Sequence, residues 1–337
     1  MKRATTQSKK QAPHLNHFYN LNHSLLQCAF WEKAMKKFVF ILIALVLAAG
    51  IYAPLTERFY DVTFAQPQEP LHIALLSDVH SGTFYLPNLF EKLKNAQQKG
   101  ELDAIFLVGD IIDDKEPIEG ARELLEGLKN DFGQTPKFYV TGNHEFMGDI
   151  DAIKALVREN EIVILDSWLP SVAVELKGHN LWLFGIDDPK GFDNDVAFWR
   201  ELLRATLTND NAWREAKRQS LPSWFGAISA APSDSSIKIL LTHRPEFIED
   251  YAQFPLDVVL SGHTHGGQVR IPFLVNGLYA PNQGLFSPYA GGLYERDKIA
   301  ESHHQAPLYL VVSRGMSLNW KIPRIFNPPE LVWLTIQ

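Results

Sequence analysis

Cysteine is almost absent from this chain, since Cys28 is the only one in 337 residues. A single cysteine excludes an intramolecular disulfide and a thiolate metal cluster. Metal ligands, if the protein has them, must therefore be oxygen and nitrogen atoms. Carboxylate and imidazole groups suit Mn, Fe, Mg or Zn.

The chain also has fewer basic than acidic residues. The chain has 32 Lys and Arg against 39 Asp and Glu, which gives a formal net charge of −7 and an isoelectric point near 5.9. This balance argues against a general nucleic-acid binder, because such a protein needs a basic field. An acidic chain can still attract an anion where it binds metal, because each divalent cation adds about two positive charges locally. No repeat of solenoid period is visible.

Long apolar runs are few, and the longest lies near the N-terminus, from Phe38 to Ala53. It is slightly shorter than the roughly 20 residues of a membrane-spanning helix and long for the core of a signal peptide. Small residues at 48–50 leave cleavage open. The sequence favours an uncleaved membrane anchor at 35–55 over a cleaved signal.

Residues 1–34 are polar and without a sustained period, and we expect them to be disordered or to come from an upstream start codon. Met35 followed by two lysines resembles a natural beginning. Lysines before the apolar run and acidic residues after it favour a cytoplasmic N-terminus. We expect a single anchor in a bacterial cytoplasmic membrane, with the side occupied by the folded part left open.

Residues 56–70 are expected to be a linker, and the folded part to begin near Leu71. From there apolar strand-like runs alternate with amphipathic helical runs, and the second half is rich in strands. This order predicts an α/β fold with two packed mixed sheets flanked by helices. The pattern is interrupted at 190–235, where we expect a helical insertion whose Trp199 and Trp213 pack as core.

The most informative stretch is Asp78-Val79-His80, directly after the apolar run 73–76. Residues at i and i+2 of an extended segment project to the same side, so this pair can bind one ion. Four more clusters of ligand-type residues each follow an apolar strand-like run. They are Gly109-Asp110-Ile111-Ile112-Asp113, Gly142-Asn143-His144-Glu145, Thr242-His243 and Gly262-His263-Thr264-His265.

Together, D-x-H, G-D-x-x-D, G-N-H-E, a lone His and G-H-T-H resemble the motifs of the calcineurin-like metallophosphoesterase superfamily, over residues 71–337 and in the family order. The resemblance implies a four-layer sandwich and two divalent metal ions, most simply Mn, with Fe, Zn or Mg as alternatives. It implies a bridging carboxylate at Asp110. The first ion would also take Asp78, His80 and His265, and the second Asn143, His243 and His263.

The same resemblance implies that His144 is not a ligand but protonates the leaving oxygen, while water activated between the ions attacks phosphorus. Asp113 would hydrogen-bond a ligand. Glu145 is expected to do likewise or to play an ordinary surface or capping role. Gly266 and Gly267 would let the backbone approach the metals or phosphate closely. Arg314 would contact phosphate or tie down its own loop.

Two features of the sequence indicate which branch of this superfamily the chain resembles. Phosphoprotein phosphatases of this superfamily have arginines where this chain has Asp114 and Thr141, which argues against that activity. The run Gly262 to Arg270, together with the motifs at 185–189, 313–315 and 327–330, instead resembles the membrane-associated bacterial branch. That branch includes UDP-2,3-diacylglucosamine pyrophosphatases of lipid A synthesis.

We therefore expect a hydrolase that cleaves a phosphodiester or pyrophosphate bond in an amphiphilic, membrane-associated substrate such as UDP-2,3-diacylglucosamine, which gives lipid X and UMP. An exported general phosphodiesterase or a phospholipid head-group hydrolase is the alternative. A membrane-anchored, non-catalytic binding protein is the alternative of another class. Neither nucleic acid nor an obligate protein partner is expected.

Overall fold

The computed structural model describes residues 14–64, 69–166, 171–192, 195–198, 200–201, 204, 235–297, 306–318 and 323–337. The chain divides into two compact units, Met1–Gly50 and Ile51–Gln337. The insertion expected at 190–235, with Trp199 and Trp213, lies largely outside the described residues.

A single long helix, α1 (His14–Ile51), occupies the described part of the first unit. Its segment Trp31–Ile51 has a mean hydropathy of 2.2 and is long and apolar enough to cross a membrane, although a signal sequence meets the same criteria. We expected irregular chain up to residue 34, and the structure instead continues the helix back to His14. Residues 14–49 contain neither Gly nor Pro, so a helix nucleated in the apolar run can propagate toward the N-terminus.

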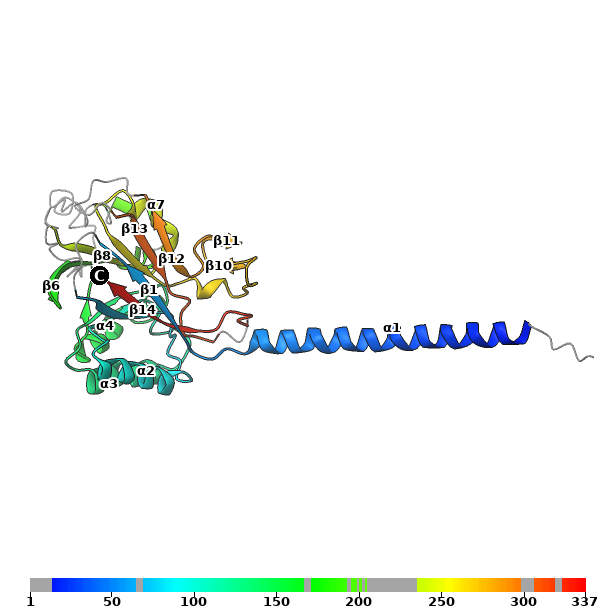
Figure 1. Ribbon diagram of the computed structural model, residues 1–337. Coiled ribbons are helices and arrows are strands. Elements are labelled where there is room, and N and C mark those ends of the chain that lie inside the picture. The colour runs from blue at the N-terminus through cyan, green and yellow to red at the C-terminus, as the bar shows by residue number, and fades with distance from the viewer. Residues whose placement is uncertain are drawn as a thin grey trace, which may run out of the picture. The chain divides into compact units, whose positions relative to one another are not determined.

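The second unit contains two six-stranded sheets (Figure 1). The first sheet has the order β1 (Thr56–Val62), β14 (Glu330–Ile336), β2 (Leu71–Leu76), β3 (Ala104–Val108), β4 (Lys137–Val140) and β5 (Val163–Ile164). All neighbours in it are parallel except β14 and β2.

The second sheet has the order β12 (Gly292–Arg296), β13 (Leu308–Val312), β9 (Val258–Ser261), β8 (Ile237–Leu241), β7 (His179–Gly185) and β6 (Ser171–Leu176). Its outer pairs, β12 with β13 and β6 with β7, are antiparallel. A separate small hairpin joins β10 (Tyr279–Ala280) to β11 (Gly284–Leu285).

Residues 56–62, expected to be part of a linker, form the edge strand β1. Its side chains are mostly exposed or half-buried, so the segment shows no clear apolar alternation. What places it in the sheet is parallel backbone pairing with β14, in which Thr56 lies opposite Glu330.

Three apolar clusters define the layers. One lies between the sheets and includes Phe106 of β3 and Leu260 of β9. Another packs the outer face of the first sheet against α2 (Leu86–Lys99), α3 (Glu119–Asp131) and α4 (Ile150–Glu159). The third packs the outer face of the second sheet against α7 (Ile248–Tyr251). The predicted fold class, two packed mixed sheets flanked by helices, is confirmed.

Local sequence signals mark the ends of the helices. Pro87 stands in the first turn of α2, and Gly100 ends that helix in the left-handed conformation with φ 73°, which glycine adopts at little steric cost. The side chain of Asp149 caps α4 by accepting a hydrogen bond from the backbone N–H of Ala152. These ends bring the chain back to the sheet for the next parallel strand.

Candidate metal centre

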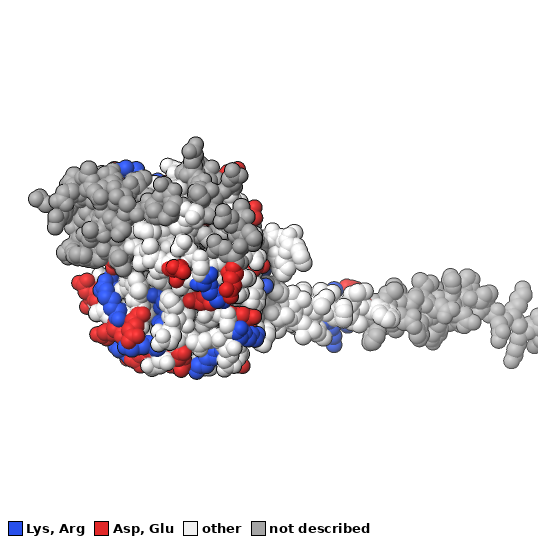
Figure 2. All heavy atoms as spheres, turned by 60° about the vertical axis from the view of Figure 1, so that its left-hand side comes forward, with Lys and Arg blue, Asp and Glu red and all other residues white. Residues whose placement is uncertain are grey.

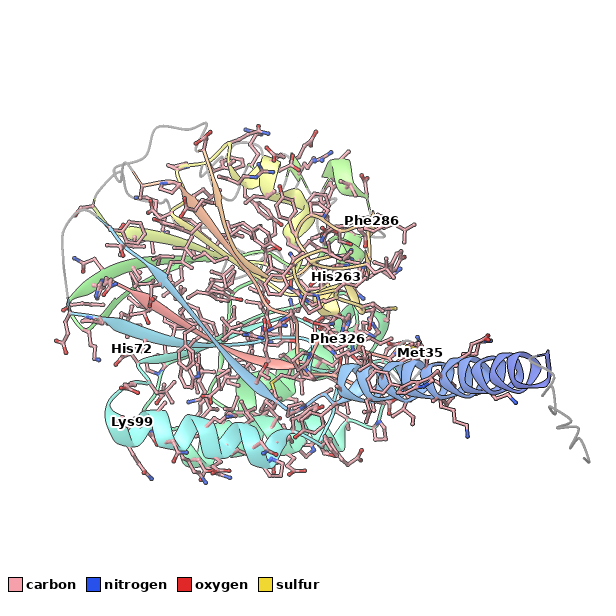
Figure 3. The ribbon with its side chains drawn as sticks, turned by 45° about the vertical axis from the view of Figure 1, so that its right-hand side comes forward. Met35, His72, Lys99, His263, Phe286 and Phe326 are labelled. Carbon is pink, nitrogen blue, oxygen red and sulfur yellow. The ribbon has the colours of Figure 1, made fainter. Side chains whose placement is uncertain are left out.

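The five ligand-type clusters meet at one edge of the sandwich. Each follows the carboxyl end of a strand, β2, β3, β4, β8 or β9, and these ends lie together because neighbouring strands run in parallel. His263, just after β9, lies within the body where the strands end (Figure 3). Clefts in α/β proteins form at this end of the strands.

The backbone turns sharply at several of these residues. Asp78, His80, Asp110 and His265 have φ between 48° and 51°, and His263 has φ 71°. Such left-handed values are uncommon for residues other than glycine, and they cluster at functional sites where the surrounding structure enforces them. Here they aim the side chains inward from the strand ends.

Asp78, His80 and His265 form the first group of side chains that could hold a metal ion. The Oδ1 atom of Asp78 lies 4.0 Å from Nε2 of His80 and 3.6 Å from Nε2 of His265. Asp78 is fully buried. Its carboxylate also accepts the backbone N–H of His263, at 3.0 and 3.2 Å.

Asp110, His243 and His263 form the second group. The Oδ2 atom of Asp110 lies 3.1 Å from Nε2 of His243 and 3.7 Å from Nε2 of His80. One carboxylate oxygen therefore faces histidines from both groups, which is the arrangement a bridging ligand needs. Asn143 lines the same cavity as Asp110 and His263.

The donor atoms fit a pair of divalent cations. Nε2 of His80 and Oδ1 of Asn143 are buried without a hydrogen-bond partner among the described residues, and Nε2 of His243 faces the Asp110 carboxylate at 3.1 Å. Buried polar atoms are nearly always paired, so two unpartnered atoms in this cluster indicate a bound group. Imidazole nitrogen with carboxylate and amide oxygen is a donor set for Mn, Fe or Zn rather than for a soft metal.

Hydrogen bonds to the opposite ring nitrogens orient these histidines. Nδ1 of His243 donates to the backbone carbonyl of Val108 at 2.8 Å, so in the neutral ring the lone pair is on Nε2. Nδ1 of His80 lies 2.6 Å from Oδ2 of Asp113, as expected for Asp113. Nδ1 of His265 lies 3.3 Å from the hydroxyl of Ser317. Partners of this kind orient metal-binding imidazoles and raise their basicity.

The charges at the centre are strongly coupled. Burial by itself raises the pKa of Asp110, but the charges of His243 and His80 outweigh it and hold that pKa well below its usual value. Burial lowers the pKa of His243, yet the charge of Asp110 raises it to about 10. Burial lowers the pKa of His265 to about 3, so this ring is neutral and can serve as a ligand.

His144 lies at the open side of the centre. Its backbone N–H donates to Oδ1 of Asp110 at 2.9 Å, and its Nδ1 lies 2.7 Å from Asp114 and 3.2 Å from Asp113. Burial lowers its pKa, but the hydrogen bond to Asp113 and the charge of Asp110 raise it to about 9. These contacts favour the protonated form of the ring, which lines the cavity in front of Asp110.

Glu145 is fully buried, so the surface role considered for it is wrong. Its Oε1 accepts the backbone N–H groups of Ile111 and Ile112, at 2.8 and 3.1 Å, and its Oε2 those of Asp110 and Gly142, at 3.1 and 2.8 Å. Four bonds from one carboxylate tie the loop after β3 to the loop after β4. Glu145 thus positions the segments that carry Asp110 and Asn143.

Arg314 ties down its own loop, as one of the two expectations proposed. It is buried, and its guanidinium and backbone N–H donate to the carboxylate of Glu330. It is not among the residues that line the cavity at Asp110.

Gly266 and Gly267 have positive φ, 62° and 67°, and are buried. A Cβ atom would lie 2.1 Å from Oδ1 of Asn327 at Gly266 and 2.4 Å from Cα of Gly277 at Gly267. These glycines permit the close approach of Asn327 and Gly277.

A cavity of about 550 Å³ adjoins the centre and is lined by Asp110, Asn143, His144, Arg244, His263 and Asn282, among others. Sequence reasoning missed two of these residues. Arg244 follows His243 directly, and that adjacency was an available signal. Asn282 lies 17 residues beyond His265, and no local pattern marked it.

Arg244 is held by several partners at the cavity wall. Its Nη2 donates to Oδ1 of Asp188 at 2.9 Å, and its Nη1 lies 2.7 Å from Oδ1 of Asn282 and 3.0 Å from Nε2 of His263. With Nε2 of His263 turned toward Arg244, Nδ1 is the atom of that ring left for a metal. Arg244 therefore places a fixed positive charge beside the second group of ligands.

Residues 71–267 match the family described as Calcineurin-like phosphoesterase. An uncharacterized metallophosphoesterase of Helicobacter pylori is 26% identical over 333 residues, which covers 95% of this chain and 76% of that protein. A protein of Chlamydia muridarum named UDP-2,3-diacylglucosamine pyrophosphatase LpxG is 38% identical over 96 residues, 28% of this chain and 27% of the relative.

Among solved structures, the NAD nucleotidase of Haemophilus influenzae is similar with a TM-score of 0.43 and 16% identity, over 73% of this chain and 45% of that one. A 5'-nucleotidase precursor of Thermus thermophilus gives a TM-score of 0.44 and 10% identity, over 80% of this chain and 54% of that one. The chain thus spans about half the length of these two structures.

Proposed function

The chain belongs to the calcineurin-like phosphoesterase family, and from that premise we propose that it hydrolyses a phosphodiester or pyrophosphate bond in an amphiphilic substrate at a membrane. As a member of the family it is a metal-dependent phosphoester hydrolase. The substrate we propose is UDP-2,3-diacylglucosamine, with lipid X and UMP as products. The observation that carries the proposal is that Nε2 of His80 and Oδ1 of Asn143 are buried without a hydrogen-bond partner among the described residues, next to a cavity that Asp110, Asn143 and His144 line.

The ligand sets we propose are Asp78, His80 and His265 for one ion and Asn143, His243 and His263 for the other, with Asp110 between them. When bound, two divalent ions would polarise the phosphoryl oxygens and lower the pKa of water. Manganese is the ion we propose to be bound. The groups of this chain supply the rest of the chemistry.

His144 is proposed as the general acid. Its imidazolium form, with Nδ1 held by Asp113 and Asp114, can donate the proton of Nε2 to the leaving oxygen of the cleaved P–O bond. Water provides the hydroxyl that ends on phosphorus. Arg244, fixed by Asp188, adds positive charge at the cavity wall, where it would stabilise negative charge developing on the phosphoryl group.

The amphiphilic substrate is supported by two observations. One is the local similarity to the pyrophosphatase LpxG, and the other is the apolar segment Trp31–Ile51, by which an anchored enzyme would be held near a lipid substrate. The UDP-linked substrate requires the cavity to face the cytoplasm.

An exported phosphodiesterase or phospholipid head-group hydrolase is the second candidate, and the charge pattern favours it. Lys36 and Lys37 precede the apolar run, whereas Glu57 and Asp61 follow it, a bias that favours a cytoplasmic N-terminus and a catalytic body outside. The metal chemistry is the same in both candidates, and only the substrate differs.

The test is hydrolysis of UDP-2,3-diacylglucosamine by the purified full chain in detergent with Mn²⁺. His144→Ala, which keeps all proposed ligands, and Asp110→Ala, which removes the proposed bridge, are the controls. We expect UMP release by the wild type only, with metal retained in His144→Ala and lost in Asp110→Ala.

Hydrolysis of bis(p-nitrophenyl) phosphate without UMP release would reject the lipid A substrate and favour the exported phosphodiesterase. Absence of turnover of either compound by the metal-loaded protein would favour a membrane-anchored, non-catalytic binding protein.

A further inference from the structure

The surface of the catalytic body carries several exposed apolar side chains in one segment, residues 271–286, which we call the apolar loop. Phe273 is 107% exposed, Leu274 81%, Leu285 68% and Phe286 66%. Scattered apolar side chains are normal on a protein surface, but a contiguous group of large ones marks an interaction site. Figure 3 shows Phe286 at the margin of the body and His263 further inside on the same side.

The apolar loop is uncharged. Between His265 and Tyr294 the sequence contains no Asp, Glu or Lys, and Arg270 is the only arginine. This contrasts with the acidic balance of the whole chain. Figure 2 shows an uncharged lobe at the margin of the body where the hairpin of β10 and β11 lies in Figure 1. The loop therefore presents no carboxylate that an anionic lipid surface would repel.

The backbone presents these side chains outward in a defined way. Phe273 and Phe286 have φ 66° and 56°, values that bulky residues adopt only under constraint. The backbone N–H of Phe286 donates to the carbonyl of Leu278 at 2.7 Å, and that of Ile271 to the carbonyl of Val275 at 3.0 Å. Hydrogen bonds within the loop thus hold strained aromatic residues in an exposed position.

Within the body, the loop lies on the same side as the residues at which this unit of the chain begins, Ile51 to Thr56. The N-terminal apolar segment ends at Ile51. The chain is fastened to the body two residues later, where the hydroxyl of Tyr85 donates to the carbonyl of Ala53. Residues 57–60 of β1 then line, together with residues 270–276, one groove of about 800 Å³. Figure 1 shows the start of β1 and the β10–β11 hairpin at the same side of the body.

We propose that the apolar loop inserts into the lipid surface beside the N-terminal apolar segment, so that the body contacts the membrane at a second point. Pro281 and Asn282 of the same loop line the catalytic cavity. Insertion of Phe273, Leu274 and Phe286 would therefore bring the entrance of that cavity to the lipid interface. The proposal does not depend on which phosphoester is cleaved.

The experiment uses the full chain, in which Cys28 is the only cysteine. In a Cys28→Ser background, Phe273→Cys and Phe286→Cys are each labelled with the fluorophore NBD. Val163→Cys is the control, because Val163 is exposed and lies on β5, at the opposite edge of the first sheet from β1. Each protein is incorporated into vesicles of phosphatidylcholine and phosphatidylglycerol, with and without nitroxide-labelled phosphatidylcholine.

We expect the emission maximum to move to shorter wavelength at positions 273 and 286, with quenching by the nitroxide lipid, and water-like, unquenched emission at position 163. Water-like emission at 273 and 286 would overturn the proposal. So would a blue shift without nitroxide quenching that grows with protein concentration, because a second copy of the chain would then cover the loop. An unfolding midpoint equal to that of Cys28→Ser shows that each variant is folded, without reference to activity.

Discussion

Glu145→Gln isolates the role of one carboxylate in holding two ligand-bearing loops together. The side chains are nearly equal in volume, so packing is kept. Each of the two carboxylate oxygens of Glu145 accepts hydrogen bonds from two backbone N–H groups. The amide of glutamine can replace only one oxygen as acceptor, and its NH₂ group would face two N–H donors instead.

The magnitude follows from these contacts. Leaving a buried N–H without an acceptor costs about 1–3 kcal/mol, so two would cost roughly 2–6 kcal/mol. Burial and the charge of Asp110 raise the pKa of Glu145, which means that they disfavour its charged form. Replacing Glu145 with neutral glutamine removes this unfavourable interaction and offsets part of the cost of the lost hydrogen bonds. We therefore expect a loss of about 2–3 kcal/mol in the free energy of unfolding. Metal affinity should fall about 10–100-fold, as for other residues that orient ligands.

The assay is urea unfolding of the metal-free protein, together with metal binding by titration calorimetry. Glu123→Gln is the matched control, since Glu123 is exposed on α3 and its change should stay within about 0.5 kcal/mol. If Glu145→Gln unfolds with the wild-type free energy and binds metal as tightly as the wild type, the positioning role is refuted.

Four further outcomes are expected. His144→Ala should keep its metal by elemental analysis while kcat falls about 10²–10⁴-fold; wild-type turnover would remove the acid role. Asp114→Asn removes the charge of one of the contacts that raise the pKa of His144 to about 9, so this pKa should fall. Because the protonated ring is the proposed active form, the loss of activity at alkaline pH should begin at a lower pH in a pH–rate profile. Chelation should lower the thermal unfolding midpoint, and added Mn²⁺ should restore it; an unchanged midpoint would argue against a bound ion. Lys154→Met leaves two buried acids, Asp166 and Asp187, without its ammonium group, and urea unfolding should show a loss of about 3–5 kcal/mol.

The order of elements and the fold class were readable along the chain because apolar runs and turn residues are local signals. The alternation of apolar strand-like runs with amphipathic helical runs corresponds to strands such as Ala104–Val108 and Lys137–Val140. The edge strand β1 was missed because pairing with β14, about 270 residues away, forms it rather than its own alternation. The extension of α1 to His14 was missed because helix propagation leaves no periodic apolar pattern.

The candidate site likewise has residues that could be predicted from the sequence and contacts that could not. Ligand-type residues after strands could be found in sequence, because parallel strands bring their carboxyl ends to one edge regardless of the loops between them. The acceptor role of Glu145, the Arg244–Asp188–Asn282 contacts and the Glu330 partner of Arg314 could not. Each joins segments separated by 16 to 56 positions, through geometry that only the packed sheets create.

By itself, the sequence determined the fold class, the oxygen and nitrogen character of the candidate ligands and the presence of an apolar segment near the N-terminus. These properties depend on composition and on short-range spacing. Only the tertiary structure decided which charges stay paired, which ligand atoms are left buried without a partner, and which loop is exposed. Those outcomes depend on distances between residues remote in the chain, and burial and electrostatic energies follow such distances.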